Sequence, residues 1–230
     1  NSFSQKNTFE IKLNNVFYRY PKKKSYALNN INLNIKQGEI IGIRGESGAG
    51  KSTLLDIMMG LLIPSKGTMF FDDINIFENR NNIIDYRNII SHVPQNPYIN
   101  YGNIIENITL EKNLKKIDYK KLDLALEISS FRNILKSDLQ LDSYLGERGQ
   151  LLSGGQRQRL SIARAIYRLP RILFLDEFTS SLDKKIEDEI LINLSSKMPK
   201  QIIIIIISHR DAPLEICNRI IKIDNGEIID

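Results

Sequence analysis

The sequence of 230 residues contains a single cysteine, Cys217, and no long hydrophobic run. One cysteine excludes an internal disulfide framework and is typical of a reducing compartment, so we expect Cys217 to have a packing role. The longest uninterrupted apolar run, residues 202–207, is far short of the roughly 18 to 20 residues that span a hydrocarbon core. The chain therefore cannot cross a membrane by itself.

The start of the chain carries no secretory signal, which would show a charged start, an apolar stretch and small residues at a cleavage site. Its first residue is Asn1 rather than methionine. We therefore expect an excised or processed piece, so the lack of a membrane span describes this piece and not its parent protein.

Charge is spread along the whole sequence. The 32 basic residues are scattered among 27 acidic ones, apart from the run Lys22, Lys23 and Lys24. The formal net charge of +5 could suit an anionic partner, but dispersed charge is usual for a solvated surface, so we expect no nucleic-acid partner. The length allows one globular core, or one core with a smaller lobe packed on it.

Short alternating apolar patterns dominate the first part of the chain, from residue 9 to residue 43. Apolar side chains recur at every second position in three places: Ile11 and Leu13; Val16, Tyr18 and Tyr20; Ile31, Leu33 and Ile35. A period of two predicts strands with one buried face. The pattern therefore predicts an antiparallel β lobe at the N-terminal end.

A compact apolar strand at residues 40–43 runs directly into a glycine-rich loop and then into a helical pattern over residues 51–62. Pro64 and Gly67 are expected to stop this helix. Two further strands are predicted, at residues 68–71 and 89–93.

The second half of the chain alternates between helical and strand patterns. Spaced apolar positions among many charged residues predict a mainly helical lobe over residues 97–149. After it we expect helices at residues 155–167 and 184–194, and strands at residues 172–175 and 202–207. Unbroken apolar strands alternating with helices indicate an α/β fold with a parallel sheet covered on both faces.

The glycine-rich loop fits the pattern G-x-x-x-x-G-K-[ST], and its residues are Gly45, Glu46, Ser47, Gly48, Ala49, Gly50, Lys51, Ser52 and Thr53. Its place between a strand and a helix is the context that a phosphate-binding loop needs. Glycines let several backbone N–H groups point inward, and the start of the helix adds its positive end. Lys51 is then placed to reach the β- and γ-phosphates, and the Ser52 hydroxyl to bind Mg²⁺. The alternative is a glycine-rich loop that binds no nucleotide.

Two acidic residues, Asp176 and Glu177, follow the strand predicted at residues 172–175. A buried parallel strand delivers its carboxyl end to the crevice where ligands bind, which would place both carboxylates beside the phosphates. We expect Asp176 to hold Mg²⁺ through its water shell and Glu177 to polarise the attacking water as a general base. An acid pair alone is weak evidence, but together with the phosphate loop it predicts hydrolysis.

A third element consists of Leu152, Ser153, Gly154, Gly155 and Gln156, followed by Arg157, Gln158, Arg159 and Leu160. Ser153 can cap a helix that two glycines open, and this amino end can offer N–H groups to a γ-phosphate. With this signature the chain resembles the ATPase domains of ATP-binding cassette (ABC) transporters. The resemblance implies a P-loop NTPase (RecA-like) core with a parallel sheet, an N-terminal antiparallel β lobe and an inserted α-helical subdomain.

The resemblance extends over residues 9–229, nearly the whole chain. It implies a single ABC ATPase domain over residues 1–230, with the β lobe and core at about 9–96 and 155–230 and the helical subdomain at about 97–154. In this family the signature of one subunit closes over the phosphate loop of another, with two ATP molecules between them. The resemblance therefore implies ATP and Mg²⁺ as cofactors and a head-to-tail dimer with a second copy or a homologous domain.

Three smaller family motifs appear in the expected order. Gln95 resembles the glutamine that contacts Mg²⁺ and the attacking water and senses the membrane partner. Asp183 resembles the acidic residue of the loop that crosses the dimer. His209, after the isoleucine strand, resembles the switch histidine that hydrogen-bonds the γ-phosphate and keeps the water and Glu177 in line. Each residue is unspecific alone, and the order of the motifs supports these assignments.

An aromatic residue near the N-terminus resembles the one that stacks on adenine in this family. Tyr20 is the residue that best fits this place. Tyr18 and Phe17 are rivals for it, and packing in the core is the alternative for all three.

Two segments resemble exporter-type members of the family. Residues 146–149 look like the segment that touches the coupling helices of the membrane domains, and residues 102–108 resemble the exporter pattern G-T-I-x-E-N-I with Asn103 in place of threonine. The resemblance implies an exporter or flippase at the cytoplasmic face of the cell membrane, with transmembrane domains in the same parent chain. The alternative is a soluble ABC ATPase of the DNA-repair or translation type, which would carry a coiled-coil insertion or a second cassette.

The chain departs from the family pattern at a few positions. Ser181 and Phe178 stand where alanine is usual, and Asp211, Ala212 and Pro213 replace the leucine and serine that commonly follow the switch histidine and arginine. The catalytic positions are intact, so we expect an active site and not a degenerate one.

Overall fold

The computed structural model describes residues 8–137 and 139–229. The chain forms two compact units, Asn1–Ile90 with Lys200–Asp230, and Ser91–Pro199. Each unit combines strands with helices, which confirms the predicted α/β class. Among the described residues, no helix has both the length and the apolar character that a membrane span requires.

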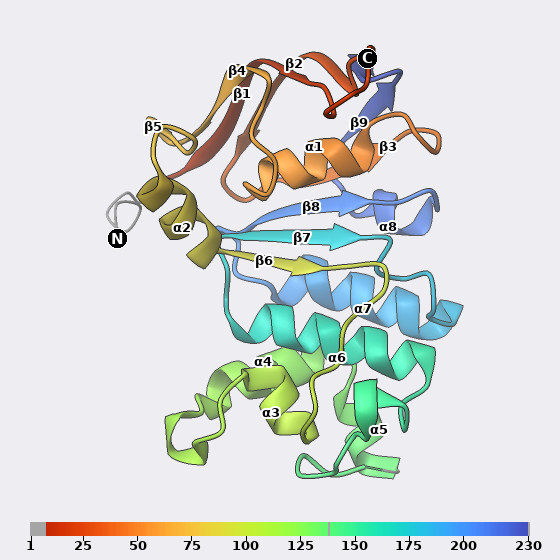
Figure 1. The fold of residues 1–230 in the computed structure, drawn as a ribbon. Helices are drawn as coiled ribbons and strands as arrows, with labels where there is room; N and C mark the ends of the chain where they lie inside the picture. The colour runs from red at the N-terminus through yellow and green to blue at the C-terminus, as the bar shows by residue number, and fades with distance from the viewer. Residues whose placement is uncertain (1–7, 138, 230) are drawn as a thin grey trace. The chain divides into compact units, whose positions relative to one another are not determined.

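The first unit contains an antiparallel sheet with the strand order β2-β1-β4-β5 (Figure 1). Its strands are β1 (Glu10–Tyr18), β2 (Leu28–Lys36), β4 (Lys66–Phe71) and β5 (Ile74–Asn75). The apolar residues of the predicted alternation within these strands are buried: Ile11, Leu13, Val16, Tyr18, Ile31, Leu33 and Ile35. A register shift after Leu13 coincides with left-handed backbone at Asn15 (φ 49), and Val16 beyond it is again buried. The predicted antiparallel lobe is therefore confirmed.

The first unit also contains three parallel strands. The middle one is β3 (Ile40–Arg44), which pairs with β8 (Ile203–Ile207) on one side and β9 (Arg219–Asp224) on the other. Every residue of β8 is buried, so the isoleucine run forms the buried strand predicted from its composition. β10 (Glu227–Ile229) pairs antiparallel with β9. The apolar runs did not predict these last two strands, because β9 buries only alternate residues, Ile221 and Ile223.

The helix α1 (Lys51–Met58) follows β3, and its predicted end at residue 62 is wrong. Gly60 adopts left-handed backbone (φ 70) just beyond the helix. Its N–H donates to the Ile57 carbonyl (2.8 Å), and the Leu61 N–H donates to the Asp56 carbonyl (2.7 Å). This pair of bonds around a left-handed glycine closes the helix before Pro64 is reached. Two more helices of this unit are α2 (Arg80–Asn88) and α8 (Ala212–Glu215).

The second unit contains β7 (Ile172–Asp176) and, apart from its first residue, the neighbouring strand β6 (Ile90–Val93). The two strands run in the same direction in Figure 1. The helices α6 (Gly154–Tyr167) and α7 (Lys184–Lys197) lie before and after β7 in the chain, as predicted. The region predicted as a helical lobe holds α3 (Ile104–Thr109), α4 (Tyr119–Ile128) and α5 (Arg132–Ser137), with short 3₁₀ helices η1 (Leu114–Lys116) and η2 (Glu147–Gly149). Both α3 and α4 pack against α6.

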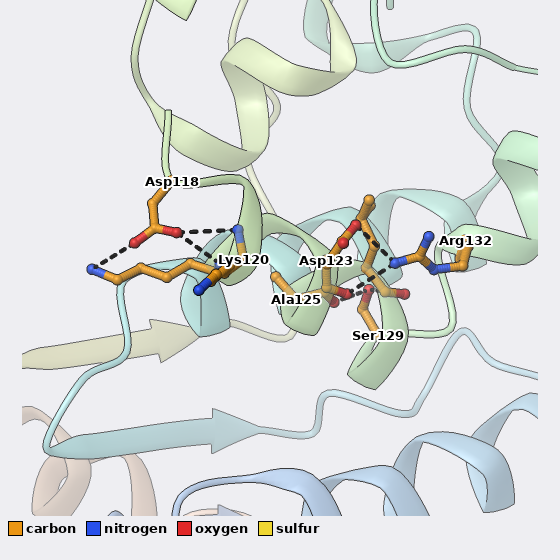
Figure 2. A network of polar contacts seen from close by, with 8 residues as sticks. Asp118, Lys120, Asp123, Ala125, Ser129 and Arg132 are labelled. Atoms are coloured by element: carbon orange, nitrogen blue, oxygen red, sulfur yellow. Dashed lines mark hydrogen bonds and ion pairs between the residues drawn. The ribbon is translucent and has the colours of Figure 1, made fainter. Parts of the chain in front are cut away.

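Polar side chains close both ends of α4 (Figure 2). Asp118 is its N-cap and accepts a hydrogen bond from the backbone N–H of Lys120 (3.1 Å). At the other end, the Ser129 hydroxyl donates to the carbonyl four residues earlier (2.7 Å), and Arg132 pairs with Asp123 (Nη2 to Oδ1, 2.9 Å). The Asp118 cap satisfies backbone N–H groups that the helix leaves unpaired at its amino end, and the Arg132–Asp123 pair joins α4 to the start of α5.

Candidate functional site

The predicted phosphate loop joins β3 to α1 in the first unit. Its backbone passes through Gly48 (φ 82) and Gly50 (φ 109), both in the left-handed region that favours glycine. A Cβ atom on Gly50 would lie 2.7 Å from the carbonyl oxygen of Ala27, whereas one on Gly48 would meet nothing within 4 Å. Gly50 is therefore required by close packing as well as by conformation, and the chain can turn tightly into α1.

Lys51, the first residue of α1, is only 7% exposed. Its ammonium group donates hydrogen bonds to the carbonyl oxygens of Gly45 (2.8 Å) and Glu46 (2.7 Å), so it lies over the backbone of its own loop. The next residue, Ser52, is exposed. The loop thus combines an ammonium group with the positive end of a helix dipole, an arrangement suited to phosphate oxygens.

Tyr20 lies beyond the end of β1 and is 40% exposed. Its hydroxyl is 3.0 Å from the hydroxyl of Thr53 in the first turn of α1, and either group can donate. The rival rings have other contacts: Tyr18 is buried and meets Tyr20 edge-on at 5.0 Å, and Phe17 packs edge-on against Tyr26 at 5.5 Å. Of the three rings, Tyr20 is the one that is exposed and linked to the phosphate loop.

His209 follows β8 and is exposed. The turn that carries it is fixed by Ser208, whose hydroxyl donates to the Arg210 carbonyl (3.0 Å) and accepts from the Arg210 N–H (2.9 Å). A hollow of about 570 Å³ is lined by His209 and by the first two loop residues, Gly45 and Glu46. The first unit therefore brings the predicted switch histidine to the start of the predicted phosphate loop.

Charged residues around this hollow were missed by sequence reasoning. Arg44, directly before the loop, forms an ion pair with Asp211 (Nη1 to Oδ1, 2.8 Å), and Lys222 and Asp224 of β9 also line the hollow. Both partners of the ion pair are half exposed or more, so it contributes little stability. It does join the phosphate loop to the segment after His209. The sequence signal that could have pointed to this ion pair is Asp211 itself, one of the positions at which the chain departs from the family pattern.

In the second unit, Asp176 is the last residue of β7 and Glu177 follows it. Glu177 has left-handed backbone (φ 44), an uncommon conformation for a residue other than glycine and one found often at functional sites. The side chain of Gln95 reaches Glu177, with Nε2 donating to Oε2 at 2.6 Å. The structure therefore brings together two predicted site residues that lie 82 positions apart in the sequence.

The signature segment opens α6, with Ser153 as the predicted cap. The Ser153 hydroxyl accepts from the Gln156 N–H (3.2 Å), and Gln156 Oε1 accepts from the Ser153 N–H (2.8 Å), forming a reciprocal capping box. A Cβ atom on Gly155 would lie 3.1 Å from the carbonyl oxygen of Ser181, while one on Gly154 would only touch the Ser181 side chain at 3.6 Å. The start of α6 thus packs against the segment that follows Glu177.

Asp183 is the N-cap of α7, and its Oδ1 accepts a hydrogen bond from the Ile186 N–H (3.0 Å). Sequence reasoning missed this capping role. An aspartate placed directly before a helical pattern is the signal that could have found it. The side chain is exposed, so the cap leaves it accessible to a further contact.

The predicted site residues are thus distributed over both units. The first unit holds Tyr20, residues 45–53 and His209, and the second holds Gln95, residues 153–156, Asp176, Glu177 and Asp183. Within the first unit, the hollow joins His209 to the loop, and a hydrogen bond joins Tyr20 to Thr53. Within the second, a hydrogen bond joins Gln95 to Glu177.

Comparison with known proteins gives these residues a context. The ABC transporter family model matches residues 28–180. The ATP-dependent lipid A-core flippase of Wigglesworthia glossinidia brevipalpis is 36% identical over 222 residues, which are 96% of this chain and 38% of the flippase. The alpha-hemolysin translocation ATP-binding protein HlyB of Escherichia coli O157:H7 is 38% identical over 221 residues, 95% of this chain and 30% of that protein.

A solved structure of a bacterial Atm1-family ABC exporter with ATP bound is also similar. It matches with a TM-score of 0.88 at 27% sequence identity, over 97% of this chain and 39% of that one. The chain spans less than two fifths of the length of these relatives. The match confirms the predicted P-loop NTPase fold. The chain therefore belongs to the ABC transporter family, as an ATP-binding domain of the exporter type.

Proposed function

We propose that this chain binds ATP with Mg²⁺ and hydrolyses it to power export or flipping of a substrate across a membrane. The observation that carries the proposal is the hydrogen bond from Gln95 to Glu177, because it orients a carboxylate at the carboxyl end of β7, the end at which parallel sheets bind ligands. The exporter names of the relatives support this function over the alternative, a soluble ABC ATPase of the DNA-repair or translation type.

The nucleotide part of the proposal concerns residues 45–53 and Tyr20. The backbone N–H groups of the loop and the Lys51 ammonium bind the phosphates, and the exposed ring of Tyr20 stacks on adenine. The left-handed glycines and the buried Lys51 support this role.

The metal part of the proposal concerns Ser52, Gln95 and Asp176. A hydroxyl, an amide and a carboxylate supply the oxygen ligands that Mg²⁺ prefers, and this ion usually takes its other ligands from phosphates and water. Because Gln95 donates to Glu177 through its amide nitrogen, its amide oxygen is the atom that it offers to an ion. When bound, the ion neutralises charge on the phosphates.

In the chemical step, Glu177 accepts a proton from the water that attacks the γ-phosphate. The bond from Gln95 keeps the carboxylate oriented toward that water. Lys51 and His209 stabilise the charge on the phosphoryl group as it passes to the water, and ADP and phosphate leave.

A second copy, or a homologous ABC domain, completes each site in this proposal. The amino end of α6, which consists of Ser153, Gly154, Gly155 and Gln156, binds the γ-phosphate held by the loop of the other subunit. The capping box supports this role because it orders the start of α6. Asp183 lies in the segment that crosses the dimer, with its carboxylate exposed beside its cap bond.

The partner and location are proposed from the relatives. We place the chain at the cytoplasmic face of the cell membrane, joined to the transmembrane domains of an exporter in the same parent protein. The exporters of which it spans 30% to 39% support this partner. The sequence of the parent tests it: several apolar segments of about 20 residues agree with the proposal, and a parent made only of ABC domains contradicts it.

The substitution Glu177→Gln tests the enzymatic function. It removes the base but keeps the size and polarity of the side chain, so hydrolysis should fall by about 100-fold or more while ATP binding is retained. Phosphate release and nucleotide binding are measured in parallel. Asp188→Asn, an exposed change on α7, is the control and should behave as wild type. Near-normal hydrolysis by Glu177→Gln would refute the assignment of the base.

A further inference from the structure

The loop that carries Gln95 is tied to α6 on both sides of this residue. On one side, Gln158 Nε2 donates to the Pro94 carbonyl oxygen at 3.3 Å. On the other side, Arg164 Nη1 donates to the Tyr98 carbonyl oxygen at 2.7 Å. Gln95 therefore lies in a segment of five residues whose two ends are held by one helix, and that helix starts at the signature.

Arg164 holds its end of the loop through several hydrogen bonds. Besides Tyr98, Arg164 donates to Asn107 through Nε (2.7 Å to the carbonyl oxygen) and Nη2 (2.8 Å to Oδ1). Asn107 is fully buried and binds both the N–H (2.9 Å) and the carbonyl oxygen (3.0 Å) of Asn100. Several charge-assisted and buried bonds share this anchor, so its loss should affect folding.

At the other end of the loop, Gln158 makes one hydrogen bond, from its neutral amide to the Pro94 carbonyl oxygen. Gln158 is fully buried, but its Oε1 has no hydrogen-bond partner among the residues that the structure describes. A buried amide oxygen without a partner costs stability, so an apolar side chain of similar size would regain that cost while giving up the bond to Pro94. Within the described residues, the bond to Pro94 is therefore the contact that a polar side chain provides at this position.

The bond to Pro94 acts directly on Gln95. The carbonyl of Pro94 and the N–H of Gln95 belong to the same planar peptide group, so holding that oxygen also fixes the direction in which the backbone enters Gln95. Pro94 adds a fixed φ and no N–H of its own. The side chain of Gln95 then reaches Glu177 at 2.6 Å.

We propose that Gln158 is a positioning residue that links the signature helix to Gln95 and, through it, to the carboxylate of Glu177. Gln158 lies in the second turn of α6, about one turn beyond the capping box of Ser153. A displacement of the signature end of α6 is therefore passed to the Gln95 loop through Pro94. The inference rests on the proposed roles of Gln95 and Glu177.

The test is a double-mutant cycle with Gln158→Met and Gln95→Ala, each alone and combined, in the purified protein. Gln158→Met removes the donor but keeps the length of the side chain, so kcat should fall about threefold to tenfold with KM for ATP changed less than about twofold. In the Gln95→Ala background the same substitution should cause no further loss of kcat. Amide hydrogen exchange in residues 95–98 should rise in Gln158→Met, independently of turnover.

Melting temperature and a control variant separate positioning from folding. Gln158→Met should melt close to wild type, because removal of the unpaired amide oxygen offsets the lost bond to Pro94. Ser161→Ala, which changes another buried residue of the same helix, should keep wild-type kcat. If Gln158→Met does not fold, Gln158→Asn carries the same expectation, because its shorter amide cannot reach Pro94.

Two results would overturn the inference: an unchanged kcat in the Gln158 variant, or an equal loss of kcat with and without Gln95. Failure of the proposed function looks different. It would appear as absent hydrolysis in the wild type or normal hydrolysis in Glu177→Gln.

Discussion

The hydroxyl groups of Tyr20 and Thr53 lie 3.0 Å apart and join the segment after β1 to the first turn of α1. The ring of Tyr20 meets Tyr18 edge-on on one side and remains 40% exposed. The phosphate loop and an exposed aromatic ring are thus held together by side chains of the same unit. A nucleotide has both a phosphate chain and a flat base, so this pairing matches its two ends.

Replacing Tyr20 by alanine should weaken ATP binding, because stacking on a base contributes about 1–3 kcal/mol. The KM for ATP should rise about tenfold, with kcat little changed. Tyr20→Phe keeps the ring and loses only the part-buried hydrogen bond to Thr53, so its KM should stay within about threefold of wild type. Steady-state kinetics measure KM and kcat of both variants. A wild-type KM in Tyr20→Ala would contradict stacking by Tyr20 and favour Tyr18 or Phe17 as the residue that stacks on adenine.

The two left-handed glycines of the phosphate loop should respond differently to substitution by alanine. Gly48→Ala should lower the free energy of unfolding by about 1–2 kcal/mol, because alanine is strained in the left-handed conformation and its Cβ would meet no other atom. Gly50→Ala should cost more than Gly48→Ala, because its Cβ would also lie 2.7 Å from the Ala27 carbonyl oxygen. Denaturant unfolding without nucleotide measures both, and equal losses would contradict the packing argument.

Mixing two inactive variants should restore hydrolysis if two copies share each site. Lys51→Ala disables the phosphate loop, and Ser153→Arg blocks the signature with a bulky side chain. A mixed pair contains one site in which an intact loop faces an intact signature, so activity should reappear on mixing. Phosphate release from each variant alone and from the mixture is the measurement. Activity that never exceeds the sum of the two would argue against shared sites between identical copies.

The stability of the protein should fall in mild acid because of His92 on β6. Burial lowers the pKa of His92 from its ordinary value of 6.5, and its Nε2 has no hydrogen-bond partner within the described part of the chain. Below pH 6.5 the unfolded chain binds a proton that the folded chain does not bind, so the free energy of unfolding decreases toward the folded pKa. Above pH 6.5 the contribution is constant.

The substitution His92→Gln should flatten this part of the pH dependence, as measured by denaturant unfolding between pH 5 and 8. The other histidine of the chain is replaced in a parallel variant, His209→Gln, which shows how much of the decrease belongs to each histidine. An identical pH profile for wild type and His92→Gln would show that another group is responsible.

The elements around the site could be predicted because their signals are local. The glycine spacing of residues 45–53, the Ser153 cap and the apolar strand before Asp176 each depend on neighbours within a few positions, and all three occur where predicted. The end of α1 is the exception. Gly60 closes that helix through a left-handed conformation, and a glycine letter alone does not tell this from a tolerated glycine inside a helix.

By itself, the sequence determined the order of strands, loops and helices and the kinds of chemical group that each would present. Only the tertiary structure decided which of those groups meet: Gln95 with Glu177, Gln158 with Pro94, and Arg44 with Asp211, which are 82, 64 and 167 positions apart. The reason is physical. Periodicity specifies which face of an element is buried, but the neighbour across that face is chosen by the packing of whole strands and helices, where small shifts decide whether two side chains are within hydrogen-bonding distance.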